Sequence, residues 1–200
     1  KSRTACQKSL RTLFPEFFFV FKPFPFNNRF MMVIGSCSFM HGTDLSLLTR
    51  HFHGLNDSSG PEFHSIVTEF FAGGYFTHPG LPYTSGDTLF IDETNDILIL
   101  LSGSVYNMDD LLHADRKGKT SALPEIIARL FIEKGPGFVC DLNGDFAIFI
   151  LRPQLRSAWL FRDHVGIHPM AYNFNNGVLS FSSDVNGLCR ALPDSRPPDT

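Results

Sequence analysis

Short apolar runs separated by turn residues recur along most of the chain. Segments 88–92 and 97–101 are two such runs, and the four polar residues between them predict a β-hairpin. Gly73-Gly74 predicts the start of a loop-rich section, because glycine pairs usually interrupt regular elements. By this pattern, strands are predicted over 31–39, 88–92, 97–101, 146–151, 158–161, 169–172 and 178–181.

A helical period occurs in only a few places. Residues 121–134 carry apolar side chains three and four positions apart, with Pro124 in the first turn and Gly135 at the end. Shorter helices are predicted to begin at Asn107 and after the Ser-Ser-Asp sequence at 182–184. Many strands, two or three helices and no regular strand–helix alternation predict an α+β fold built on antiparallel sheets.

Composition narrows the classes of function. Apolar residues make up 43% of the 200 residues and charged residues 18%, which is enough to build a substantial core. The chain has no uncharged apolar run of about 18 residues, which argues against a membrane-spanning helix. The net charge of −3 provides no basic surface for nucleic acid. We therefore expect neither a nucleic acid nor a membrane as a partner.

Charge is unevenly distributed along the chain. Residues 1–30 carry six basic side chains against one acid, hold eight of the 22 phenylalanines and are interrupted by prolines. This basic, Phe-rich arm is expected to be either disordered or upstream of a start at Met31 or Met32. The domain itself is expected over 31–192, followed by a tail at 193–200.

The four cysteines show no paired short spacing, so the sequence predicts neither a zinc ribbon nor a redox motif. Three of them, Cys37, Cys140 and Cys189, fall within the predicted domain. We expect these three to be reduced, buried residues of a cytoplasmic protein.

Four segments carry the motifs of one family in the correct order and spacing. The sequence at 162–169 is R-D-H-V-G-I-H-P, where the family pattern is R-D-x-x-G-[IV]-x-P. Weaker matches are L-S-G-S-V-Y-N at 101–107, L-N-G-D-F-A at 142–147 and F-S-S-D-V-N-G-L at 181–188. Together they resemble the glutaminase domain of class II glutamine amidotransferases, especially that of the asparagine synthase family. The resemblance implies a four-layer αββα sandwich of two antiparallel sheets, as in N-terminal-nucleophile hydrolases.

The resemblance also implies a chemistry whose key residues are replaced here. In the family, an amino-terminal cysteine attacks the side-chain amide of glutamine, and its own α-amino group acts as the base. The family start M-C-G-I-A-G aligns with 31–36, so Met32 stands at the nucleophile position. The family's oxyanion hole uses an Asn side chain and the backbone N–H of the following Gly. These positions are occupied by Ser102 and Gly103.

The substrate-anchoring positions of the family are also replaced. The arginine that holds the substrate carboxylate aligns near Gly80, and the aspartate that holds its ammonium group aligns at Leu123. Neither residue can make the ion pairs that bind an amino acid. The residues that are kept are expected to fix a tight turn between two strands: Arg162, Asp163, Gly166 and Pro169.

The closely spaced histidines and acids of the sequence do not indicate a metal site or an acid–base pair. His164 and His168 are four residues apart, but the glycine and proline around them indicate a turn rather than a helix, so we expect no metal site. Asp141 and Asp145 are expected to be solvated cap or turn residues. No cofactor is expected in this chain.

These replacements favour a glutaminase-like domain that cannot hydrolyse glutamine and supports an ATP-dependent synthetase domain in cis or in trans. No S-G-G-x-D-S phosphate loop occurs in the sequence, so the synthetase would have to lie elsewhere. One alternative is a stand-alone protein- or ligand-binding module whose cleft is apolar at Met32 and Leu123. A second is an active glutaminase whose nucleophile is Cys37, exposed by cleavage after Ser36. A homodimer stays open in each case.

Overall fold

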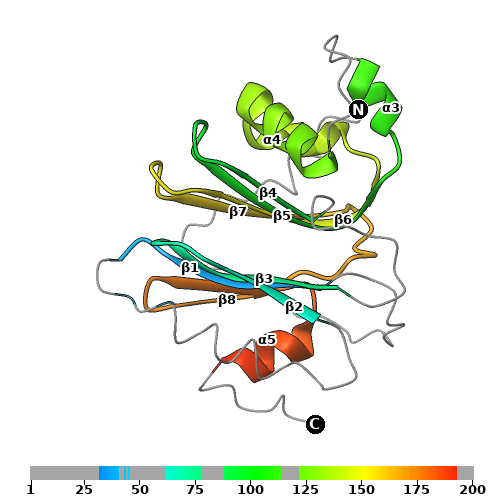
Figure 1. Ribbon diagram of the computed structural model, residues 1–200. Coiled ribbons are helices and arrows are strands. Elements are labelled where there is room, and N and C mark those ends of the chain that lie inside the picture. The colour runs from blue at the N-terminus through cyan, green and yellow to red at the C-terminus, as the bar shows by residue number, and fades with distance from the viewer. Residues whose placement is uncertain are drawn as a thin grey trace.

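Two antiparallel sheets face each other in the computed structural model, and helices lie on their outer sides (Figure 1). The structure describes residues 32–40, 43, 45, 62–77, 88–113 and 122–192. From one side to the other, the layers are helices α3 and α4, a four-stranded sheet, a five-stranded sheet and helix α5. This is the αββα order that the resemblance implied. The predicted arm 1–30 and tail 193–200 lie outside the described residues.

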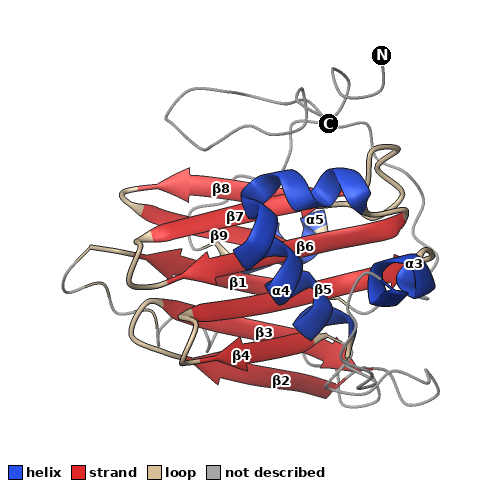
Figure 2. Ribbon diagram, turned by 90° about the horizontal axis from the view of Figure 1, so that it is seen from above, coloured by secondary structure: helices blue, strands red, loops and turns tan. Residues whose placement is uncertain are grey.

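All neighbouring strands in both sheets are antiparallel. The five-stranded sheet has the order β2 (Glu62–Val67), β3 (Phe71–Thr77), β1 (Val33–Ser38), β9 (Val178–Ser182), β8 (Ala171–Asn175). The four-stranded sheet has the order β4 (Leu89–Asp92), β5 (Ile97–Val105), β6 (Gly144–Arg152), β7 (Ser157–Arg162). Seen from above, the strands of the two sheets run in similar directions, as in an aligned sandwich (Figure 2).

The helices begin and end close to where the sequence predicts. Helix α4 (Leu123–Lys134) has Pro124 in its first turn and ends at Gly135, whose φ of 63° favours glycine. The carboxylate of Asp184 caps α5 (Val185–Ala191) by accepting hydrogen bonds from two backbone N–H groups. Helix α3 (Met108–His113) follows Asn107. A 3-10 helix, η2 (Gly135–Asp141), continues directly from α4 and was not predicted.

The hydrophobic core divides into an inter-sheet layer and an outer layer on each sheet. Between the sheets, Phe149 stacks on Phe181 with ring centroids 4.1 Å apart and on Phe71 at 5.4 Å. On the outer side of the four-stranded sheet, Phe131 of α4 meets Trp159 edge-on at 4.9 Å. On the outer side of the five-stranded sheet, a smaller cluster of Ile34, Phe63 and Phe76 forms the third layer.

The loop predicted at Gly73-Gly74 is wrong, because both glycines lie inside strand β3. A Cβ atom on Gly73 would lie 2.5 Å from Cα of Gly35 on the neighbouring strand. A Cβ atom on Gly74 would collide with the carbonyl oxygen of His64 on the other neighbour. The glycines therefore allow three backbones to approach closely, which is a role that glycine takes in strands as well as in turns.

The expectation for the cysteines is correct only in part. Cys37 is reduced and buried, and Cys189 is reduced and half-buried. Cys140 is disulfide-bonded and exposed, because it lies in the surface helix η2 rather than in the core. The cysteines therefore give no argument for a reducing compartment.

Candidate functional site

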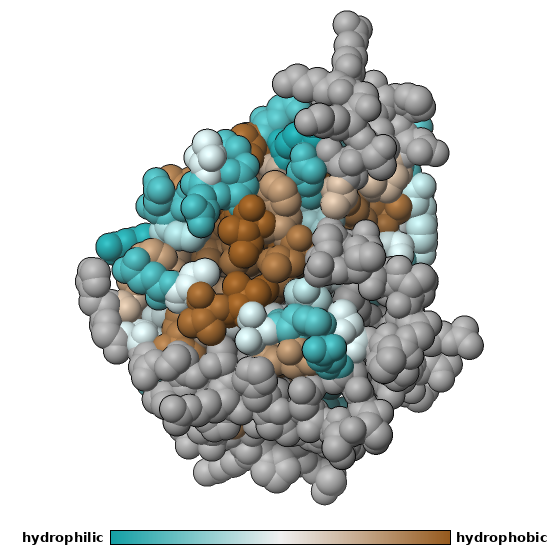
Figure 3. All heavy atoms as spheres, in the orientation of Figure 1, coloured by the Kyte–Doolittle hydropathy of each residue, from teal (hydrophilic) through white to brown (hydrophobic). Residues whose placement is uncertain are grey.

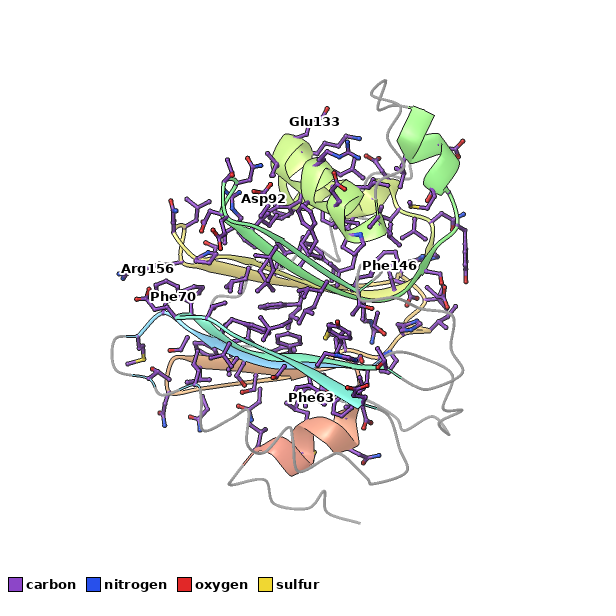
Figure 4. All side chains as sticks on the ribbon, viewed as in Figure 1. Phe63, Phe70, Asp92, Glu133, Phe146 and Arg156 are labelled. Carbon is purple, nitrogen blue, oxygen red and sulfur yellow. The ribbon has the colours of Figure 1, made fainter. Side chains whose placement is uncertain are left out.

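Met32 and Ser102, two of the replaced family positions, lie near strand ends at one end of the sandwich. At this end β1 begins at Val33, opposite Tyr75 near the end of β3. On the other sheet, the last residues of β5 pair with the first residues of β6. Figure 4 shows Phe63 of β2 and Phe146 of β6 on the two sheets at this end.

Met32 packs on the outer side of the five-stranded sheet. Its neighbour Val33 belongs to the inter-sheet core, and side chains alternate along a strand, so Met32 shares the opposite face with Ile34. Its sulfur lies 3.3 Å from the position that a Cβ atom on Gly187 of helix α5 would take. The carbonyl oxygen of Met32 accepts a hydrogen bond from the backbone N–H of Phe76 at 2.9 Å. The thioether therefore serves as apolar packing between the sheet and α5.

Ser102 faces the inter-sheet space and is 1% exposed. It lies opposite Ala147 and follows the alternation of Leu98 and Leu100, which both belong to the inter-sheet core. The residue after it, Gly103, has a φ of 107°, and a Cβ atom there would collide with the carbonyl oxygen of Asp145. The backbone alone therefore requires glycine at this position, whatever chemistry it performs.

Cys37 lies in the interior of β1, paired with Phe71 on one side and Leu179 on the other. It is 2% exposed, and this burial raises the pKa of Cys37 to about 12. A cysteine nucleophile reacts as the thiolate, which is a negligible fraction of such a thiol at neutral pH. Cleavage after Ser36 would also divide the central strand of the sheet.

Leu123, aligned with the family's substrate-anchoring aspartate, is the first residue of α4. Its side chain packs against the cluster between the helix and the four-stranded sheet. Met32 belongs to a different cluster, on the outer side of the other sheet. The structure therefore does not bring Leu123 and Met32 together in one apolar cleft, and Gly80 lies outside the described residues.

The retained motif at 162–169 forms a tight turn around one buried carboxylate. Asp163 is 2% exposed, and its two oxygens accept hydrogen bonds from the backbone N–H groups of Val165, Gly166, Ile167 and His168 at distances between 2.5 and 3.1 Å. Such bonds to an ionised acceptor are stronger than those between neutral groups. The carboxylate thus holds the turn through the backbone.

The other motif residues pack on the same turn. Gly166 has a φ of 78°, and a Cβ atom there would lie 2.7 Å from Nη2 of Arg162. The guanidinium group therefore lies directly over the glycine, and a side chain at this position would have to displace it. Pro169 follows half-buried, two residues before β8 begins.

Comparison with known proteins identifies the family. A model of the glutamine amidotransferase domain matches residues 82–197, which is more than half of the chain. The chain belongs to this family. The amidotransferase domain is 34% identical over 111 residues to asparagine synthetase [glutamine-hydrolyzing] 2 of Bacillus subtilis (strain 168), covering 54% of this chain and 15% of that protein. It is 29% identical over 154 residues to the asparagine synthetase of Sandersonia aurantiaca, covering 72% of this chain and 27% of that protein.

A solved structure shows the same fold. Glutamine phosphoribosylpyrophosphate amidotransferase from B. subtilis, complexed with ADP and GMP, superposes on the amidotransferase domain with a TM-score of 0.55 and 15% identity. The match covers 80% of this chain and 43% of that one. The chain spans less than a third of the length of the asparagine synthetases above.

A polar cluster that sequence reasoning missed lies at the same end of the amidotransferase domain. Asp145 was expected to be solvated, but it is 9% exposed and accepts a 2.6 Å hydrogen bond from the hydroxyl of Tyr106. This bond raises the pKa of Tyr106. Nδ1 of His168 lies 3.7 Å from the same carboxylate, and burial lowers the pKa of His168. The sequence could have predicted this burial. Ala147 and Phe149 face the inter-sheet core, and Asp145 is on the same face because side chains alternate along a strand.

A second missed group lies on the five-stranded sheet. Nε2 of His64 is 2.8 Å from the hydroxyl of Thr77, and its ring stacks on Tyr75 with centroids 4.9 Å apart. These residues lie on neighbouring edge and interior strands, β2 and β3. The hydrogen bond and the ring stacking therefore hold the His64 side chain against β3.

The described residues offer no arrangement for a metal ion. Within them, no three His, Cys, Asp or Glu side chains gather closely enough to hold one. His164 is exposed whereas His168 is 1% exposed, so the two do not share an environment. Among the helices that the structure describes, none has the length and apolar character needed to cross a membrane.

Proposed function

We propose that this amidotransferase domain does not hydrolyse glutamine and serves as the scaffold of an asparagine-synthase-like protein. In this proposal an ATP-dependent synthetase domain, in cis or in trans, binds ATP and forms the amide. The amidotransferase domain itself needs no cofactor, and the assembled protein works in the cytoplasm.

The observation that carries the proposal is the lack of a competent nucleophile on β1. Met32 has a thioether, which has no proton to lose and cannot form a thioester with glutamine. Its side chain packs toward α5, on the outer side of the sheet. Cys37 does have a thiol, but it is buried with a pKa of about 12 and its backbone is paired on both sides.

The oxyanion position gives independent support. A serine hydroxyl is shorter than an asparagine amide, and donors must lie within about 3.1 Å of the developing oxyanion to stabilise it. Gly103 keeps its family identity, but the positive φ and the close approach of Asp145 account for it. A retained glycine here is therefore no evidence of retained catalysis.

The synthetase partner is supported by the relatives. The proteins named above are called glutamine-hydrolysing asparagine synthetases, and this chain corresponds to 15% and 27% of their length. A domain that keeps the packing motifs of such enzymes keeps the shape on which the remainder is built. This supports a scaffold role without requiring hydrolysis.

The proposal is tested by measuring glutamate released from glutamine by the purified 200-residue chain, with an active glutamine-hydrolysing asparagine synthetase as the positive control. We expect release at the uncatalysed background, and Cys37→Ala should leave it unchanged. Release at enzymatic rates overturns the proposal. If that release is lost in Cys37→Ala and the mature chain begins at Cys37 by mass spectrometry, the active alternative is correct instead.

A second variant separates the missing nucleophile at Met32 from the replaced oxyanion donor at Ser102. Met32→Cys restores a thiol at the aligned position, and in a shortened chain that begins at Met31, removal of Met31 leaves this cysteine amino-terminal. We expect no gain in glutamine hydrolysis, because this side chain faces α5 and Ser102 still replaces asparagine. A gain of a hundredfold over background would show that a single substitution inactivated the domain and that the rest of the site is intact.

A further inference from the structure

The outer strand β8 differs from the other three edge strands of the two sheets. Sheet edges present unpaired backbone groups, and proteins commonly protect them with charged residues or proline. Glu62 lies in β2, Asp92 in β4 and Arg162 in β7, so each of these edges carries a charge. Strand β8 reads A-Y-N-F-N and has neither a charge nor a proline. It forms the outermost strand of the wider sheet in Figure 2.

Two aromatic side chains of β8 are exposed on the inward-facing side of the sheet. Tyr172 is 40% exposed and Phe174 is 59% exposed. They lie opposite Phe181 and Leu179 of β9, which are both buried in the inter-sheet core. In Figure 2, β8 lies beyond β7, which is the edge strand of the four-stranded sheet at that margin. On its core-facing side, β8 therefore presents two largely exposed aromatic side chains.

The hairpin geometry fixes which backbone groups point outward. A two-residue turn at Asn176-Gly177, with φ values of 49° and 74°, closes the β8–β9 hairpin in the manner of a type I′ turn. In such a hairpin the flanking pair, here Asn175 with Val178, is hydrogen-bonded, and bonded pairs then alternate along the strand. The N–H and C=O groups of Tyr172 and Phe174 therefore point away from β9.

We propose that β8 pairs antiparallel with β8 of a second copy of this chain, around a two-fold axis at Asn173. In this register, Tyr172 lies opposite Phe174 of the second copy, and the reverse pair forms on the other side of the axis. The four outward-pointing groups of each strand then bond to the four of the other. The two five-stranded sheets become one continuous sheet of ten strands.

The strand is suited to pair with itself for two reasons. Its aromatic residues are symmetric about Asn173, so one register brings both aromatic pairs together, and such cross-strand pairs stabilise sheets. The absence of charge on β8 means that two copies of a chain with a net charge of −3 meet without like charges opposite each other. A two-fold interface of this kind closes on itself and does not extend into fibres.

The other edge strands with exposed apolar residues in the described part of the chain are not free of charge as β8 is. Figure 3 shows apolar side chains gathered across the middle of one flank of the sandwich. Ile91 of β4 and Val67 of β2 are exposed apolar residues of two other edge strands, but both strands carry an acid. The dimer through β8 does not depend on whether the domain hydrolyses glutamine.

Analytical ultracentrifugation of the 200-residue chain over a range of concentrations tests the proposal. We expect a monomer–dimer equilibrium. Phe174→Pro removes an outward N–H from each copy, and so two of the four intermolecular bonds, while leaving the β8–β9 ladder intact. The dimer Kd should rise by about tenfold or more. Tyr172→Lys should weaken the dimer as well, whereas Ile132→Lys on α4, a side chain of similar exposure (44%), should not.

Amide hydrogen exchange gives a residue-level readout. Asn173 and Asn175 should be protected at every concentration, because their N–H groups bond within the hairpin. Tyr172 and Phe174 should become protected only where the dimer is populated. A chain that is monomeric at all concentrations overturns the proposal. So does a dimer that neither β8 variant weakens, provided that circular dichroism shows the variants to be folded.

Discussion

Two regions align with family motifs: the 162–168 turn, and the strand ends formed by the start of β1 and the end of β5. The turn retains the motif residues, whereas the strand ends differ from the motif. In the turn, the carboxylate of Asp163 binds four backbone N–H groups and the guanidinium of Arg162 covers Gly166. At the strand ends, the proposed alignment places Met32 and Ser102 where the family has its nucleophile and its oxyanion donor. Under the proposed function, the motif has persisted for packing while the residues that perform the reaction have been replaced.

The largest expected effect concerns Cys37, which lies near the opposite end of β1 from Met32 and is the nucleophile of the active alternative. With a pKa of about 12, only about one Cys37 thiol in 10,000 is ionised at pH 8. We expect alkylation of Cys37 in the native protein to be at least about a hundredfold slower than in urea, because burial limits both ionisation and access. Site-resolved mass spectrometry measures both rates, with the half-buried Cys189 as an internal control. Fast native labelling of Cys37 would mean that β1 keeps a reactive thiol and would favour the active alternative.

The next largest effect tests how much Asp163 stabilises the 162–168 turn. Asp163→Ala leaves four backbone N–H groups without their acceptor, and we expect it to lower the free energy of unfolding by about 3 kcal/mol or more. Asp163→Asn should cost less, because its amide oxygen still accepts from some of these groups. Urea unfolding measures each variant against Asp110→Ala, an exposed acid on α3 that should change little. If Asp163→Ala unfolds like the control, the motif has been kept for a reason other than packing.

A pair of glycine substitutions compares the two regions directly. Gly103→Ala should lower the free energy of unfolding by about 3 kcal/mol, because the new Cβ meets backbone of the paired strand. Gly166→Ala should cost only about 1 kcal/mol, because its neighbour is the flexible end of Arg162, which can move. Equal costs from denaturant unfolding would contradict the view that backbone geometry alone requires Gly103.

The sequence predicted elements well where local chemistry determines them. The hairpin formed by β4 and β5 has four polar residues between apolar runs, and α4 has proline at its start and glycine at its end, so each was placed within a few residues. Gly73-Gly74 was read as a loop because the close approach of neighbouring strands cannot be seen from one segment. The family and the layered fold were also predictable, because four short motifs retain their order.

The site was less predictable, because it depends on which face of a strand each residue occupies. Aligning Met32 with the nucleophile says nothing of its direction, which follows from Val33 being in the inter-sheet core. Leu123 and Met32 were expected to share one cleft, but they pack on the outer sides of different sheets. Asp145 was taken as solvated because it follows a turn, whereas the alternation of β6 directs it inward. The pairing of neighbouring strands shows which face each residue occupies, and this cannot be read from a single segment of sequence.

The smallest expected effect is a pH dependence that links the turn to the strand ends. His168 belongs to the turn and faces Asp145 at the start of β6, with the carboxylate of Asp163 also nearby. Burial lowers the pKa of His168 below its ordinary value of 6.5, despite the two acids. Between the lowered value and 6.5, the unfolded chain binds a proton at this histidine that the native protein does not. Stability is therefore complete above pH 6.5 and falls as the pH decreases through this window.

His168→Gln removes this titration and should flatten the pH dependence. We expect the unfolding free energy of the natural sequence to fall between pH 6.5 and 5 more steeply than that of the variant, by at most about 1.4 kcal/mol per pH unit. His164→Gln, an exposed histidine in the same turn, is the matched control and should leave the slope unchanged. Urea unfolding at several pH values measures the slopes. Identical slopes for His168→Gln and the natural sequence would show that the buried imidazole titrates as it does in water, and that the cluster does not couple the two regions.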